Sequence, residues 1–232
     1  MTQPDRRHDD ANTADSSAAA LSTTIDGIIG RFESMNAARD HAITTGRQVI
    51  RLAANTVRAL HRGDHESAAT LLDEASVLLA EIRATTAPHP ALYWAGYVQD
   101  AMKEYAEAAI TANLLADRLL PSPDALKVED AAWLNALAEA GSELRRAVLD
   151  RLRADRHMEG ERLLTRMDEI YAVLVTVDFP DAITGGLRRT TDQFRAVLER
   201  TRGDVTVAVR QHRLELALRS VDERLRSAQS NG

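Results

Sequence analysis

Acidic side chains recur at helical spacing in two stretches of the chain, and carboxylates can do acid–base chemistry or bind metal ions. In the first stretch, Asp100, Glu104 and Glu107 stand at positions i, i+4 and i+7. At about 100° per residue, these three fall within a sector about 60° wide on one helix. In the second stretch, Glu139 and Glu143 stand at i and i+4 beside an apolar stripe. Each stretch therefore presents carboxylates along one helical face.

These acidic faces need a compensating cation, because like charges at i, i+4 repel each other. The nearest basic residues in the sequence are Lys103 and the pair Arg145 and Arg146. A divalent metal is the chemical alternative: Mg²⁺, or Mn²⁺ in its place, prefers hard oxygen ligands and would activate water or polarise a phosphate. The ordinary alternative is that these carboxylates face solvent without binding a metal, and their spacing alone does not exclude it. A metal site requires that oxygens from both stretches converge.

Other kinds of active site are restricted by what the sequence lacks. There is no Cys, which excludes thiol catalysis and thiolate metal sites and fits a reducing compartment. No His stands three residues after any of these glutamates, so a ferritin-like di-iron oxidase is disfavoured. An all-helical nucleotide pyrophosphohydrolase would use Glu-x-x-Glu together with acids on the next helix. That activity stays open as an enzymatic alternative.

Arginines form a second pattern, a cationic ridge on the predicted first helix, made of Arg47, Arg51, Arg58 and Arg62. These side chains fall within about 80° of one another, away from the apolar positions of the helix. A guanidinium presents a planar fork of donors to phosphate oxygens, so the ridge predicts binding to a nucleic-acid backbone. The alternative is a solvent face whose arginines pair with acids of the next helix, namely Glu66, Asp73 and Glu74.

Histidine and aromatic residues are weaker candidates. We expect structural or surface roles for the isolated histidines, which include His61, His65, His157 and His212. Exposed aromatic rings could stack on bases, but helical spacing in a chain with 4% aromatic residues favours core positions for them. The aromatic residues concerned are Tyr93, Trp94, Tyr97, Tyr105 and Trp133.

The elements that position these residues are predicted to be helices. With 232 residues, 44% of them hydrophobic, the chain can bury the core of one domain, and few Gly, Pro or aromatic residues interrupt its helix formers. We predict an all-α bundle of about seven antiparallel helices. Their predicted ranges are 24–60, from the Asp64 cap to 82, 91–119, 128–154, 156–177, 187–202, and from the Gly203-Asp204 cap to 225.

The composition of the chain predicts one helical domain between two tails. Residues 1–23 are polar and predict a disordered tail, 24–225 form the helical domain, and 226–232 are expected to fray. No secretory signal and no apolar run of roughly 20 residues is present, so we expect a cytoplasmic protein with no membrane partner. A net charge of -6 means that any nucleic-acid binding must be local.

Four stretches resemble the family of translin and translin-associated factor X, in the shorter form found in prokaryotes. They are ALHRGD at 59–64, KEYAEA at 103–108, EAGSELRR at 139–146, and DFPD at 178–181 continuing to GGLRR at 185–189. Each string is weak alone. Their order and separation within a seven-helix pattern make chance agreement improbable.

The resemblance implies an all-helical subunit of a hollow homo-oligomer, an octamer, that binds single-stranded RNA or DNA. In the factor X branch such a protein cuts RNA with Mg²⁺, and its catalytic, metal-binding acids fall on Glu104, Glu107, Glu139 and Glu143, with Asp100 as a candidate outer ligand. The factor X pattern has Asp where this chain has Glu139, whose carboxylate reaches about an ångström further. The implied function is a Mg²⁺-dependent endoribonuclease acting on single-stranded RNA. A non-catalytic binding module is the alternative.

Overall fold

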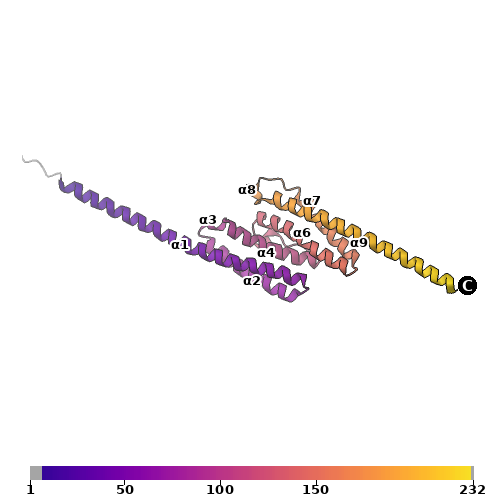
Figure 1. Ribbon diagram of the computed structural model, residues 1–232. Helices are drawn as coiled ribbons and strands as arrows, with labels where there is room; N and C mark the ends of the chain where they lie inside the picture. Colours follow the sequence, from indigo (N-terminus) through magenta and orange to yellow (C-terminus); the bar gives the residue numbers. More distant parts are fainter. Residues whose placement is uncertain (1–6, 231–232) are drawn as a thin grey trace, which may run out of the picture.

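The computed structural model describes residues 7–230, and this part of the chain is helical with no strand. Nine helices follow one another within it: α1 (Arg7–His61), α2 (His65–Thr86), α3 (Pro90–Tyr93), α4 (Gly96–Leu115), α5 (Pro123–Leu126), α6 (Asp130–Arg153), α7 (His157–Leu174), α8 (Asp181–Thr184) and α9 (Leu187–Ser230). Figure 1 shows an elongated bundle from which the start of α1 and the end of α9 project at opposite ends. The predicted all-α fold is confirmed. No helix of the described range is long and apolar enough to cross a lipid bilayer.

The first two helices form a hairpin whose turn follows from its sequence. Gly63 adopts a left-handed conformation (φ 76°), which a glycine reaches without steric cost. The Asp64 side chain then accepts a hydrogen bond from the Ser67 backbone N–H and caps α2. The hairpin lies against α4, so the last turns of α1 run beside the centre of the bundle.

Helices α4 and α6 form that centre and pack closely because many of their buried residues are alanine. On α6, a Cβ added to Gly141 would lie 2.6 Å from Cζ of Phe194, a fully buried ring of α9. Glycine therefore lets α9 approach this face of α6. Glu139 and Glu143 are each two residues away, about 200° around the helix, so they project from the opposite side.

Two predicted helix boundaries are wrong. The helices expected at 187–202 and from Gly203 onward are one helix, α9, in which Gly203 is an interior residue. Thr201 and Val205 are buried on either side of it, and Asp204 pairs with Arg145 of α6 at 2.8 Å instead of capping a new helix. A glycine inside a helix costs only about 1 kcal/mol, which this packing offsets.

The other boundary error concerns the helix expected at 91–119. It is divided into α3 and α4, because Ala95 is extended (φ -68°, ψ 143°) and ends the first segment. The expected tail 1–23 falls partly outside the described residues, and from Arg7 it forms the start of α1. Residues 231–232 of the expected C-terminal tail also lie outside them, and the part before continues α9 as far as Ser230.

Candidate metal centre and nucleic-acid interface

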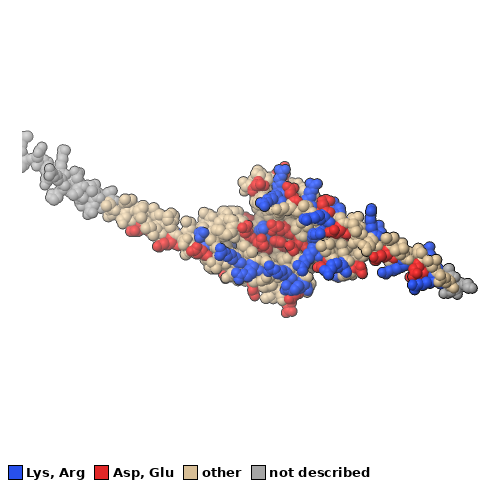
Figure 2. Space-filling model, viewed as in Figure 1, with Lys and Arg blue, Asp and Glu red and all other residues tan. Residues whose placement is uncertain are grey.

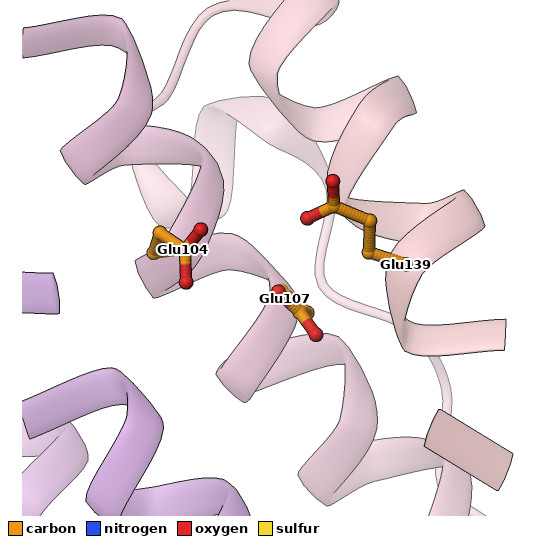
Figure 3. Close-up of side chains that lie close together, drawn as sticks. All are labelled: Glu104, Glu107 and Glu139. Carbon is orange, nitrogen blue, oxygen red and sulfur yellow. The ribbon is translucent and has the colours of Figure 1, made fainter. Parts of the chain in front are cut away.

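Three glutamates from two neighbouring helices converge at the surface of the bundle. Glu104 and Glu107 lie on α4 and Glu139 lies on α6, and one oxygen of each lies within 4.8 Å of the others. Figure 3 shows the carboxylates of Glu104 and Glu139 turned toward the space between the two helices, with Glu107 between them. We call these three residues the acid cluster. All three side chains are partly buried.

The pattern of small and aromatic residues in α4 and α6 places the acid cluster at the edge of the core. In α4, Tyr105 and Ala108 are buried next to Glu104 and Glu107 in the sequence. In α6, Ala138 and Ala140 are fully buried on both sides of Glu139. Because these neighbours pack inward, the glutamates are held where α4 meets α6, with their carboxylates close together and only partly hydrated.

This proximity changes the protonation of Glu107. Burial, followed by the negative charges of Glu139, Glu104 and Glu143, raises the pKa of Glu107 to about 8, and a hydrogen bond with Glu139 adds to the effect. Glu107 therefore keeps its proton to a higher pH than an ordinary glutamate and, when protonated, donates a hydrogen bond to the Glu139 carboxylate. A divalent cation bound by the acid cluster would replace this proton, because carboxylates bind metals in their ionised form.

The ammonium group of Lys103 lies among the same carboxylates. Its Nζ is 2.8 Å from Oε2 of Glu139 and 3.2 Å from Oε1 of Glu104. Burial lowers the pKa of Lys103, but the hydrogen bond and charge of Glu139 and the charge of Glu104 outweigh it and raise the pKa. Of the three basic residues expected near the acids, Lys103 is the one that bridges two of them. Arg145 pairs with Asp204 of α9 instead.

Glu143, one helical turn after Glu139, is held by a histidine of α1. Its Oε2 lies 2.8 Å from Nε2 of His61, at the end of α1. The His61 side chain is only 4% exposed, against 37% for Glu143. The expectation that His61 is isolated is therefore wrong. Spacing offered no signal, since 82 residues separate the two partners and only the packing of α1 against the bundle joins them.

Asp100 is not part of the acid cluster. It is exposed, and it lines a neighbouring cavity to which Lys103 and Glu139 also contribute. Its role as an outer metal ligand stays a prediction.

The four arginines of the cationic ridge are exposed along α1. Within residues 7–230 none of them pairs with a carboxylate, and Arg58 donates a hydrogen bond to Asn55 at 2.7 Å. Arg58 and Arg62 line a shallow hollow of about 510 Å³ between α1 and α2. Figure 2 shows acidic side chains gathered over α4 and α6, with basic side chains beside them over α1. This face therefore places exposed cations, which attract phosphate, next to carboxylates, which attract metal ions.

Known structures share this fold over most of the chain. The complex of AfC3PO with duplex RNA matches with a TM-score of 0.75 and 32% sequence identity, over 80% of this chain and 96% of the AfC3PO chain. The chain belongs to the translin-like C3PO family. A crystal structure of AfC3PO also matches this translin-like chain, with a TM-score of 0.74 and 31% identity, over 80% of this chain and 96% of the AfC3PO chain.

One curated relative also matches the translin-like chain along most of its length. It is an uncharacterised protein of Methanocaldococcus jannaschii, 25% identical over 195 residues, which are 84% of this chain and 86% of that protein. No protein-family model matches the sequence. The family predicted from four short stretches, in α1, α4, α6 and around α8, is thus confirmed by the AfC3PO structures.

Proposed function

We propose that this translin-like chain binds RNA and cuts it in a reaction that depends on a divalent metal ion. The observation that carries this proposal is the convergence of Glu104, Glu107 and Glu139 within 4.8 Å, beside a ridge of exposed arginines that form no ion pair within residues 7–230. AfC3PO, a relative at 32% identity, has been solved with duplex RNA, which supports RNA as the ligand. The family resemblance favours single-stranded RNA as the substrate that is cut.

The residues present fit a hard divalent cation. The acid cluster offers carboxylate oxygens only, which suits Mg²⁺ or Mn²⁺. Glu107 takes up a proton in a cluster that is too negative to ionise completely, and a bound cation would relieve that repulsion. Glu104, Glu107 and Glu139 would hold the ion, with Glu143 fixed nearby by His61. When bound, Mg²⁺ supplies an activated water and neutralises charge on the phosphodiester.

The protein's own residues would position the strand. Arg47, Arg51, Arg58 and Arg62 lie along α1 and can bind successive phosphates through their guanidinium groups. Phosphate contacts fix the register of a strand and carry no sequence information. The ridge thus supports binding of RNA with weak sequence preference, followed by cleavage where the backbone passes the acid cluster.

Apolar stripes on the projecting helical ends support assembly with further copies of the chain. The first part of α1 exposes Leu21, Ile25, Ile29 and Phe32, and the last part of α9 exposes Leu214, Leu218, Val221 and Leu225. Positions spaced i, i+4, i+7 or i+8 and i+11 form one stripe along a helix, and such stripes are typical of helices that pack on a partner. We propose a homo-oligomer, with the hollow octamer of the family resemblance as its form.

The proposal is tested by incubating labelled single-stranded RNA and duplex RNA with the protein in Mg²⁺, Mn²⁺ or a chelator. We expect cleavage with metal only, reduced at least about a hundredfold in Glu104→Gln and Glu139→Gln. Glu74→Gln, an exposed acid on α2, is the matched control and should cut normally. Salt-sensitive binding without cleavage would identify a non-catalytic module. Hydrolysis of nucleoside triphosphates with no action on RNA would identify a pyrophosphohydrolase.

A further inference from the structure

A cavity of about 420 Å³ adjoins the acid cluster, and the proposed reaction gives it no role. Lys103 and Glu139 form one part of its wall, so it opens directly beside the carboxylates. Trp94, at the end of α3, forms another part, and Ala182 and Ile183 of α8 contribute apolar surface. The volume lies within the range of about 300–1,000 Å³ that is typical of sites for small organic groups.

Trp94 has the position and the support of a stacking surface. Trp94 as a whole residue is 61% exposed, although burial of an indole is normally favourable. The ring packs edge-on against Tyr93, with centroids 5.2 Å apart and planes at 88°. The Tyr93 hydroxyl in turn donates a hydrogen bond to Glu129, and Gln99 donates to the Tyr93 carbonyl oxygen at 2.9 Å. The indole is therefore exposed but fixed, which lowers the entropic cost of stacking a planar group on it.

The cavity also offers acceptor oxygens to the edge of such a group. Asp100 is exposed and forms no ion pair within the described residues. Gln99 uses its amide N–H on Tyr93, so its carbonyl oxygen is free to accept. The donors of Lys103 are directed to Glu104 and Glu139. A planar group bearing an amino group would match this set of acceptors, and three of the four RNA bases carry one.

We propose that this cavity binds one nucleobase of the RNA strand, stacked on Trp94, with Asp100 accepting a hydrogen bond from the exocyclic amino group of that base. This inference rests on the proposed function, because the base must belong to a strand whose phosphate reaches the acid cluster. Lys103 and Glu139 line the cavity and also lie at the acid cluster, so one strand can place a base in the cavity and a phosphate at the cluster. The cavity thus adds a base-dependent contact to a ridge that recognises phosphates only.

Fluorescence of Trp94 tests the stacking directly. The chain has two tryptophans, so Trp133→Phe leaves Trp94 as the only indole. In a chelator, which prevents cleavage, we expect a short oligoadenylate to quench this emission. An abasic oligonucleotide of equal length should bind through its phosphates without quenching. In the wild-type background, followed by anisotropy of labelled strands, Trp94→Ala should weaken oligoadenylate binding about tenfold and leave abasic binding unchanged.

The role of Asp100 is tested with two pyrimidine strands, which differ in the amino group of cytosine. We expect oligocytidylate to bind about fivefold more tightly than oligouridylate, and Asp100→Ala to remove the difference. Equal binding of the two strands to the wild type would overturn the assignment of Asp100.

The outcomes separate this inference from the proposed function. If RNA binds by anisotropy but neither quenches Trp94 nor depends on it, the base site is wrong and the proposed function stands. If no RNA binds under any condition, the proposed function fails and the base site fails with it. Loss of oligoadenylate affinity in Trp94→Ala, with unchanged abasic binding, supports the base site even if Trp133→Phe does not fold.

Discussion

The ammonium of Lys103 lies 2.8 Å from Glu139 and 3.2 Å from Glu104, so a cation of the chain itself sits among the carboxylates proposed to hold a metal ion. Its charge offsets part of the repulsion within the acid cluster. A divalent ion binding the same oxygens has to displace this ammonium or tolerate it nearby. Lys103 is thus expected to stabilise the metal-free protein and to weaken metal binding.

Replacing Lys103 therefore has opposite effects on the two states. Lys103→Met should bind Mn²⁺ about three- to tenfold more tightly by calorimetry, because a neighbouring positive charge is gone. The same variant should unfold at lower temperature in a chelator. The chain has one other lysine, the exposed Lys127, so Lys127→Met is the matched control for loss of charge. Mn²⁺ affinity that is equal or weaker in Lys103→Met would show that the ammonium does not compete with the ion.

The raised pKa of Glu107 predicts how stability depends on pH. The ordinary value of 4.5 rises to about 8 in the folded chain, so the folded state binds more protons than the unfolded state between these values. Stability from this group is complete below about pH 4.5 and is lost as the pH rises through about 8. In a chelator, the midpoint of thermal unfolding should fall across this window for the wild type and less steeply for Glu107→Gln. Mn²⁺ affinity should rise over the same range.

A matched acid outside the cluster separates this effect from general titration. Glu74→Gln on α2 should keep the pH dependence of the wild type. Parallel curves for the wild type and Glu107→Gln would mean that Glu107 titrates normally.

The contact between His61 and Glu143 predicts a positioning role for the histidine. His61→Ala frees the Glu143 carboxylate and leaves a small cavity, so we expect slower cleavage, with RNA affinity changed less than about twofold. Gln can donate from a similar position, and His61→Gln should recover part of the rate. Cleavage kinetics with RNA in excess give kcat and KM separately. A change confined to KM, or no rescue by Gln, would argue against positioning.

The close approach of α9 to α6 predicts opposite outcomes for two glycines. Gly141→Ala places a Cβ 2.6 Å from Phe194, whose ring is fully buried, so we expect a loss of roughly 1–3 kcal/mol in unfolding free energy. Gly203→Ala has no atom within 4 Å of the new Cβ and lies inside α9. The unfolding free energy of Gly203→Ala should rise by about 0.5–1 kcal/mol, because Ala has a higher helix propensity than Gly. Denaturant unfolding of both variants measures the difference, and a stabilised Gly141→Ala would contradict the described packing.

The cationic ridge predicts how RNA binding depends on salt. Each ridge arginine that neutralises a phosphate adds nearly one unit to the slope of log affinity against log salt. Arg51→Ala and Arg58→Ala should each weaken binding and lower the slope by about one. Arg166 of α7 already pairs with Asp117 and Glu169, so Arg166→Ala is the control and should leave the slope unchanged. Equal slopes in the wild type and in all variants would show that RNA binds elsewhere on the protein.

The helices and the acidic faces of α4 and α6 could be predicted from the sequence because they follow local periodicity, while the joint role of these acids followed only from the family resemblance. Spacing of three residues puts Glu104 and Glu107 on one helical face, whereas their convergence with Glu139 depends on how α4 packs on α6, since residues 116–129, including α5, connect the two helices. The break predicted at Gly203 failed, since a glycine signals an end only where no packing continues beyond it. Thr201 and Val205 are buried against the bundle on both sides of that residue.

Contacts between distant segments could not be predicted in the same way. His61 reaches Glu143 because α1 packs along the bundle, and no local pattern encodes that partner. Trp94 was expected in the core from its helical spacing, yet it is exposed because α3 ends there and Ala95 is extended. Periodicity predicts which side of a helix is buried, but it cannot predict a residue's environment where the helix stops.

The central claim is that α4 and α6 bring three carboxylates to one divalent ion. Anomalous diffraction from a crystal containing Mn²⁺ measures this directly. We expect one peak about 2.0–2.3 Å from oxygens of Glu104, Glu107 and Glu139, with the Lys103 ammonium displaced from its present contacts. A peak held by other residues, or none at saturating Mn²⁺ with Lys103 still bridging Glu104 and Glu139, would contradict the claim.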